Sequence, residues 1–209
     1  MIKYALFDWD GTLADTYDVL IKAYELTFEK LGLKKISADE IKQITATVQN
    51  RDILSYLYGN QALKAKEIFY AYIDAYHLKG LKPIDGAREL LDFCVQNGIE
   101  PRLITNKSEK YIFEELAFLG FEKYFTKVVY AGKYAKDKPH PIACRALFDN
   151  KMPNGDEIIV IGDGCSDVRL ATFFNAKSVI LGTKAKGDYC IQALTQAIDI
   201  IKGLQNESK

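Results

Sequence analysis

Short apolar runs alternate with amphipathic stretches along most of the chain. The runs are rich in β-branched and aromatic residues and end at turn-forming residues, which is typical of buried strands. They cover residues 3–7, 101–105, 127–130, 157–161 and 178–181. Apolar residues recur at helical spacing in 85–96, 109–119, 141–149, 167–174 and 189–204. This alternation of strands and helices predicts an α/β fold built on a parallel sheet.

The segment that follows the first run has a different pattern. Residues 15–80 show no strand signal, but they contain four stretches with helical periodicity or a helix-capping signature. These stretches begin near Asp15, Ser37, Asp52 and Ala62. We therefore expect a core formed by residues 1–14 and 81–209, with residues 15–80 inserted as a four-helix cap.

Composition and charge narrow the class of protein. The 209 residues suffice for one domain, or for one domain with an insert, and 48% of them are hydrophobic. Lys plus Arg and Asp plus Glu both number 28, which argues against a nucleic-acid-binding surface. Four scattered cysteines, no signal segment and no bilayer-length apolar run favour a cytoplasmic protein without a membrane partner. We expect a monomer or a weak homodimer.

Two carboxylates, Asp8 and Asp10, come directly after the first predicted strand, and Gly11 follows them. In an open α/β sheet, the carboxyl ends of the strands are where ligands bind. Neighbouring carboxylates repel each other unless a cation lies between them, and Mg²⁺ prefers such oxygen ligands. A surface turn is the alternative interpretation, because Asp and Gly are common turn residues.

The stretch Phe7-Asp8-Trp9-Asp10-Gly11-Thr12-Leu13 resembles the D-x-D-G-T motif of the haloacid dehalogenase superfamily of phosphohydrolases. It is most similar to the phosphoglycolate phosphatase-like branch. This resemblance implies a Rossmann-like core with a helical cap inserted directly after the motif, and it covers essentially the whole chain.

A second motif of the family matches Thr105 and Asn106, which end a predicted strand. The resemblance implies that the Thr105 hydroxyl and the Asn106 backbone N–H bind a phosphoryl oxygen. The alternative interpretation is a helix N-cap region, where such residues are favoured.

The third motif matches Lys138, which stands directly before Pro139-His140-Pro141 at a predicted helix start. A lysine here offsets the carboxylates and binds a phosphoryl group as a point charge. Lys133 and Lys136 are nearby competitors, but they do not precede the Pro-x-Pro sequence.

The fourth motif is Gly162-Asp163, with Asp167 four residues after Asp163, at the end of a strand of β-branched residues. It resembles the family's G-D-x-x-x-D pattern. The resemblance implies that Asp163 is a metal ligand and that Asp167 acts on the metal indirectly or through water. Asp167 is alternatively a cap of the next helix, and both roles are compatible.

The resemblance implies a mechanism with two catalytic carboxylates. Asp8 attacks phosphorus, and Asp10 acts first as general acid and then as general base. Mg²⁺ is expected to bind Asp8, Asp163 and the backbone carbonyl of Asp10. The residues expected to bind the substrate are Trp9, Gly11, Thr12, Thr105, Asn106 and Lys138.

These motifs predict a phosphatase that acts on a small phosphorylated metabolite similar to phosphoglycolate. One alternative is a phosphomutase of the β-phosphoglucomutase type, which returns the phosphoryl group to a substrate. Another is a non-catalytic module that binds a phosphorylated ligand. Arg51, in the predicted cap, is a candidate for binding a second anionic group of the substrate, or else a solvated loop residue.

Overall fold

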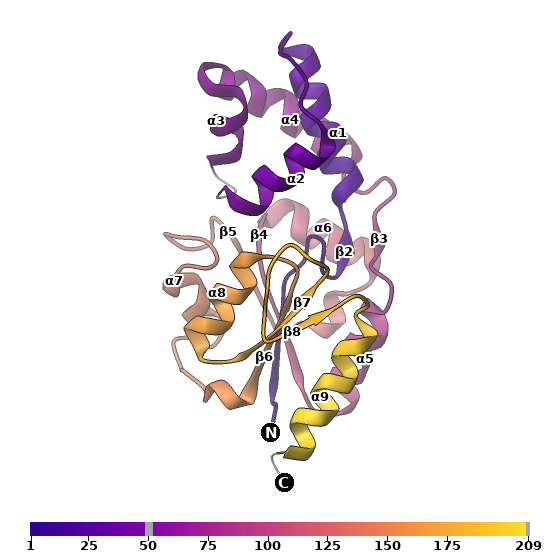
Figure 1. Cartoon of the computed structure of the whole chain (residues 1–209), viewed down its shortest axis with the longest axis vertical. Coiled ribbons are helices and arrows are strands. Elements are labelled where there is room, and N and C mark those ends of the chain that lie inside the picture. Colours follow the sequence, from indigo (N-terminus) through magenta and orange to yellow (C-terminus); the bar gives the residue numbers. More distant parts are fainter. Residues whose placement is uncertain (49–51, 208–209) are drawn as a thin grey trace. The chain divides into compact units, whose positions relative to one another are not determined.

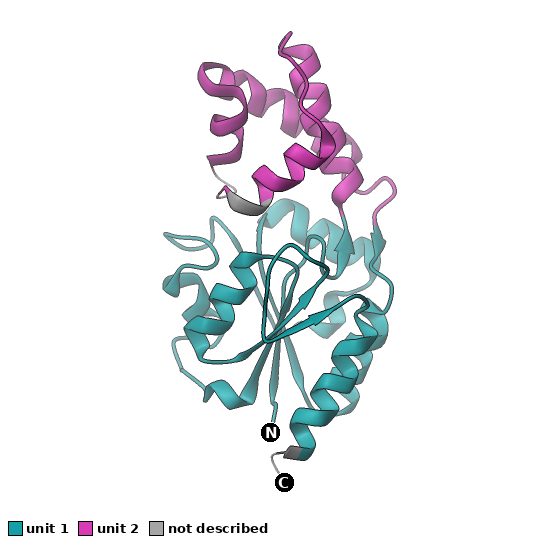
Figure 2. Cartoon of the chain, viewed as in Figure 1, with its two compact units in different colours: residues 1–15, 82–209 teal, residues 16–81 magenta. Residues whose placement is uncertain are grey.

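The structure is a computed structural model that describes residues 1–48 and 52–207. The chain forms two compact units (Figure 2). Unit 1 comprises Met1–Asp15 and Lys82–Lys209, and unit 2 comprises Thr16–Leu81. The second unit is therefore an insertion into the first along the chain.

Unit 1 is built on a six-stranded parallel sheet in the order β5-β4-β1-β6-β7-β8 (Figure 1). The strands are β1 (Tyr4–Phe7), β4 (Glu100–Ser108), β5 (Lys127–Ala131), β6 (Ile158–Gly162), β7 (Lys177–Leu181) and β8 (Tyr189–Ile191). Such a sheet needs helical crossovers that cover both of its faces. The α/β Rossmann-like fold expected from the alternating pattern is thus confirmed.

The helices of unit 1 lie between the parallel strands along the chain, except the last, which follows β8. They are α5 (Ala87–Gln96), α6 (Glu109–Leu119), α7 (Pro141–Ala146), α8 (Cys165–Phe174) and α9 (Thr195–Glu207), with short 3₁₀ turns η3 (Glu122–Tyr124) and η4 (Gly155–Glu157). Within the described chain, no helix is both long enough and apolar enough to cross a membrane.

The central strands are buried because nearly every side chain on them is apolar. All five residues of β6 are buried, as its run of β-branched side chains predicts. Leu6 and Val160 share a core with Leu147 and Leu170, on the side of the sheet that carries α7 and α8. Successive strand residues point to opposite faces, and the ring of Phe7 accordingly packs against Phe125 instead.

Two short pieces of sheet differ from the prediction. Residues 189–191 form the edge strand β8, so the expectation of one helix over 189–204 is wrong at its start. The strands β2 (Ala14–Asp15) and β3 (Lys82–Pro83) pair antiparallel where the chain leaves and re-enters unit 1. Elements of two or three residues are too short to show a period in the sequence.

Unit 2 contains α1 (Tyr17–Lys30), α2 (Ala38–Thr47), α3 (Ile53–Tyr58), η2 (Gly59–Gln61) and α4 (Ala62–Tyr76). The expected capping box is present, since Ser37 accepts from the N–H of Glu40 and the Glu40 side chain accepts from the N–H of Ser37. Aromatic pairs contribute to the core of this unit, together with buried aliphatic side chains. The pairs are Tyr24 with Phe69 and Phe28 with Tyr58.

Candidate active site

The four sequence motifs meet at one edge of the sheet. Strand β1 lies between β4 and β6, with Phe7 opposite both Leu103 and Ile161. From β1 the sheet continues to one side through β4 and β5 and to the other side through β6, β7 and β8. The chain connections on the two sides of β1 therefore run in opposite directions. Such a position is where open α/β sheets bind ligands.

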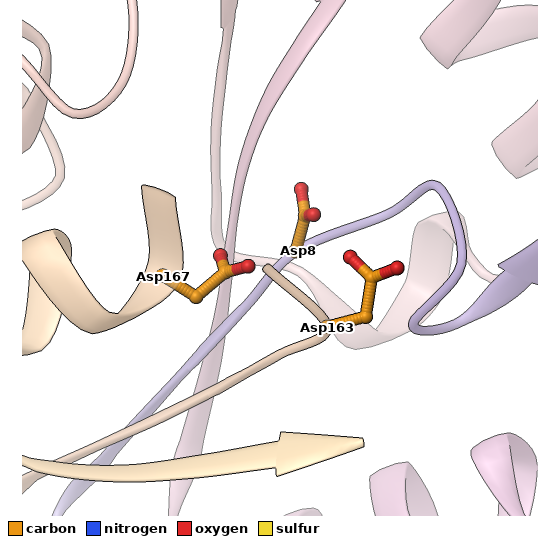
Figure 3. A group of neighbouring side chains, drawn as sticks. All are labelled: Asp8, Asp163 and Asp167. Atoms are coloured by element: carbon orange, nitrogen blue, oxygen red, sulfur yellow. The ribbon is translucent and has the colours of Figure 1, made fainter. Parts of the chain in front are cut away.

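Three carboxylates lie together at this edge. One carboxylate oxygen from each of Asp8, Asp163 and Asp167 lies within 4.8 Å of the other two, and Figure 3 shows the three side chains converging. The Asp167 side chain is fully buried and that of Asp8 is 14% exposed. Three negative charges at this separation in a buried place require a cation.

Lys138 supplies part of that positive charge. Its Nζ lies 2.9 Å from Oδ1 of Asp8 and 2.5 Å from Oδ1 of Asp167, and it donates to the carbonyl of Ile104 at 3.3 Å. Burial by itself lowers the pKa of Lys138, but the attraction of Asp167 and Asp8 outweighs burial and raises it. Lys138 is therefore a fixed cation beside Asp8.

The pKa of Asp8 is raised to about 6. Burial is the main cause, since it disfavours the charged form, and Lys138 offsets only part of this effect. Asp167 and Asp10 add repulsion. Burial and the charge of Asp8 likewise raise the pKa of Asp163, and Lys184 opposes this shift. The carboxylates are thus short of positive charge even with the lysines in place.

Carboxylate oxygens are the donors that Mg²⁺ prefers. The positions of Asp8, Asp163 and Asp167 fit such an ion, because their oxygens converge. The pKa values of Asp8 and Asp163 are raised, so a cation beside them would favour their charged forms. The side chain of Asp10 is not part of this cluster. A contribution from its backbone carbonyl remains a prediction.

Glycines allow the close approach of these groups. Gly11 has φ +75°, and a Cβ there would lie 2.5 Å from Oδ2 of Asp163. A Cβ on Gly162 would overlap the Asp167 carboxylate. Asp167 Oδ2 also accepts from the N–H of Gly164 at 3.0 Å, so Asp167 caps α8 as well as binding Lys138.

The turn after β1 is held by its own backbone. The N–H of Gly11 donates to the carbonyl of Ala14, and the N–H groups of Thr12 and Ala14 donate to the carbonyl of Trp9. The Thr12 side chain is fully buried. Binding of substrate by Gly11 and Thr12 stays a prediction. Thr12 has no exposed side-chain atom that could contact a substrate in this structure.

The second motif lies in an irregular part of β4. Thr105 is buried, and its Oγ1 accepts from the N–H of Lys107 at 3.1 Å. Within residues 1–48 and 52–207, Oδ1 of Asn106 and Oγ1 of Thr12 are buried without a hydrogen-bond partner. Strand β4 continues to Ser108, past the end expected at Thr105, and its register with β5 shifts between Ile104 and Ser108.

Three residues that the motifs did not identify are also present. Lys107 Nζ lies 2.7 Å from Oδ1 of Asp10 and 2.6 Å from Oε2 of the buried Glu115. Lys184, from the connection between β7 and β8, contacts Oδ2 of Asp163. Lys107 directly follows the second motif in the sequence, and this adjacency is the one sequence feature that could have indicated its presence in the site. Arg51 lies outside the described residues.

Comparison with known proteins agrees with this arrangement. The profile of the family described as haloacid dehalogenase-like hydrolase matches residues 5–181. The chain belongs to this family. The assignment made from the four motifs is therefore confirmed, and this hydrolase carries the family's motif residues at the edge of its sheet.

Curated relatives of the hydrolase have phosphatase names. A phosphoglycolate phosphatase from Vibrio parahaemolyticus is 29% identical over 183 residues, which cover 81% of this chain and 79% of the relative. A candidate pyrophosphatase from Caldanaerobacter subterraneus subsp. tengcongensis is 28% identical over 216 residues, which cover 99% and 97%. These names agree with the expected class, a haloacid dehalogenase-like phosphoric monoester hydrolase.

Solved structures share the fold. A haloacid dehalogenase-like hydrolase from Streptococcus pneumoniae superimposes with a TM-score of 0.81 at 18% identity, covering 96% of this chain and 98% of the other. The architecture is thus found in proteins of quite different sequence.

Proposed function

We propose that this hydrolase is a Mg²⁺-dependent phosphatase that cleaves a small-molecule phosphomonoester through an aspartyl-phosphate on Asp8. The observation that carries the proposal is the position of Asp8, at the carboxyl end of β1, 2.9 Å from the buried ammonium of Lys138 and beside Asp163. A carboxylate nucleophile and a dianionic phosphate approach each other only where positive charge is concentrated.

Asp8, Asp163 and the backbone carbonyl of Asp10 would hold Mg²⁺, and Asp167, whose oxygens lie within the same cluster, would act on the ion indirectly or through water. The ion, when bound, neutralises charge on the phosphoryl oxygens. Lys138 holds Asp8 in place and offers the phosphoryl group a fixed positive charge.

In the first half of the reaction, a carboxylate oxygen of Asp8 forms a bond to phosphorus as the bond to the leaving oxygen breaks. Asp10 gives its proton to that oxygen. In the second half, Asp10 takes a proton from water while the water oxygen attacks phosphorus and releases Asp8. Asp10 thereby returns to its starting protonation state.

The substrate class is proposed from the relatives. Phosphoglycolate and pyrophosphate appear in the names of the matched proteins, so small anionic phosphate compounds are the first substrates to test. We also propose that unit 2 serves as the cap that selects among them. The chain enters and leaves this unit at β2 and β3, where Asp15 pairs with Lys82, so both connections are short.

The test is phosphate release from a panel of compounds in the presence of Mg²⁺. The panel contains phosphoglycolate, sugar phosphates, nucleotides, pyrophosphate and p-nitrophenyl phosphate. We expect the wild type to turn over part of the panel, and the variants Asp8→Asn and Asp10→Asn to lose several orders of magnitude in kcat while remaining folded. EDTA should remove the activity, and added Mg²⁺ should restore it.

Two outcomes would contradict the proposal. Near-wild-type activity of purified Asp8→Asn would rule out Asp8 as the nucleophile. Activity that resists EDTA would rule out a requirement for the metal. No release from any compound would lead to the phosphomutase alternative, which is tested by adding a sugar bisphosphate as activator and following isomerisation of a sugar phosphate.

A further inference from the structure

Asp10 contacts the first of a group of buried side chains that comprises Lys107, Glu115 and Trp9. Lys107 Nζ lies between Oδ1 of Asp10, at 2.7 Å, and Oε2 of Glu115, at 2.6 Å. The indole Nε1 of Trp9 donates to the same oxygen of Glu115 at 2.6 Å. The side chains of Lys107 and Glu115 are 11% and 1% exposed.

This arrangement restrains a side chain that is normally flexible. A lysine on a four-carbon stem holds a partner poorly unless its ammonium is itself fixed. Here Glu115 fixes it with both carboxylate oxygens, at 2.7 and 2.6 Å. Glu115 is in turn held by the indole of Trp9, the residue directly before Asp10. Glu115 therefore holds the side chain of Trp9 directly and that of Asp10 through Lys107.

We propose that Lys107 is a positioning residue for Asp10, which it holds through Oδ1 in the orientation in which the carboxyl group exchanges the proton. This inference rests on the proposed function, in which Asp10 serves as acid and base. The proton passes from the Asp10 carboxyl group to the leaving oxygen in the first half of the reaction and from water to the Asp10 carboxylate in the second. Lys107 keeps its three protons throughout and does not touch the substrate.

A purely structural role for Lys107 makes a different prediction. Glu115 is buried, and a buried carboxylate without a cation is strongly destabilising. If neutralising Glu115 were the only task of Lys107, removing both charges would restore stability and activity together. If Lys107 positions Asp10, removing both charges would restore stability alone.

The experiment compares Lys107→Met, Glu115→Gln and the double variant with the wild type. Gln at position 115 keeps an oxygen that accepts from Trp9 and removes the charge. The measurements are Tm, kcat and KM, with Mg²⁺ and p-nitrophenyl phosphate or the best compound of the panel. Lys123→Met, which removes an exposed lysine of the same unit, is the matched control and should behave as wild type.

We expect Lys107→Met to lower Tm and to lower kcat about 10- to 100-fold, as displacement of a catalytic group by about 1 Å does, with KM changed less than about 3-fold. The double variant should regain most of the lost Tm and keep the low kcat. Recovery of kcat in the double variant would overturn the proposal. A raised KM with unchanged kcat would also overturn it, because Lys107 would then bind substrate.

A crystal structure of the double variant supplies a test that needs no activity. The Asp10 side chain should leave the orientation that it has in the wild type, and an unchanged orientation would overturn the inference. If the wild type released no phosphate from any compound, the proposed phosphatase would fail, while this structural comparison would still decide the role of Lys107.

Discussion

Asp8 is placed where its charge is unfavourable for the fold. Burial and two neighbouring carboxylates, only partly offset by Lys138, raise its pKa from the ordinary 3.8 to about 6. A carboxyl group with a raised pKa binds more protons in the folded state than in the unfolded state between these values. The stability of the metal-free protein therefore falls as the pH rises from about 4 to about 6, and the loss is complete above that range.

Asp8→Asn is thus expected to stabilise the metal-free protein while it abolishes turnover. At pH 7.5 with EDTA, the free energy of unfolding should rise by about 1–3 kcal/mol, the upper value being the pKa shift converted at 1.36 kcal/mol per unit. The gain should shrink as the pH falls toward 4 and disappear below about pH 3, where Asp8 is protonated in both states. Thermal unfolding at several pH values measures this gain in stability. A variant that is less stable than the wild type at pH 7.5 would contradict the prediction.

At the scale of an element, the turn between β6 and α8 leaves no room beside Gly162. A Cβ there would overlap the carboxylate of Asp167, which holds both Lys138 and the N–H of Gly164. At Gly164 the nearest atom to an added Cβ is 3.8 Å away, and the φ of −137° suits any residue. Two glycines of one turn therefore differ in their tolerance of a side chain.

Gly162→Ala should destabilise the protein by about 1–3 kcal/mol, as overpacking does, and should lower kcat because Asp167 and Lys138 are displaced. Gly164→Ala is the matched control and should cost less than about 1 kcal/mol. Urea unfolding and phosphate release measure both effects. Equal effects of the two substitutions would show that the close approach of Asp167 does not decide which position of this turn tolerates a side chain.

At the scale of the whole molecule, the expected metal site lies entirely within unit 1. An ion that binds only the folded state stabilises it, by about 2.7 kcal/mol at a concentration 100 times its Kd. The chain has a single tryptophan, Trp9, which also belongs to unit 1. Its fluorescence therefore reports the unfolding of the unit that should respond to Mg²⁺.

Mg²⁺ should raise the Tm followed by Trp9 fluorescence, and the rise should be lost in Asp163→Asn, which removes a carboxylate from the cluster. Asp149→Asn, at an exposed aspartate of the same unit, is the control and should keep the full rise. Equal rises in the two variants would mean that Mg²⁺ stabilises the protein somewhere other than at Asp8, Asp163 and Asp167.

The sequence by itself determined the strands of the parallel sheet other than β8, and the residues at the carboxyl edge of that sheet. Runs such as Ile158–Gly162 are buried strands because their side chains are apolar and β-branched, and a residue that ends such a run lies at the sheet edge by geometry alone. Asp8, Asp163 and Lys138 could therefore be named in advance, since each directly follows a strand or precedes a helix in a recognisable motif.

Only the tertiary structure decided which other charges reach that edge. Trp9 and Glu115 are 106 positions apart in the chain, and no periodic pattern relates them. Lys107 enters the site because β4 runs past Thr105 with a shifted register, and Lys184 enters it from a loop. Ion pairs depend on distances between side chains of different elements, whereas periodicity describes only the face of one element.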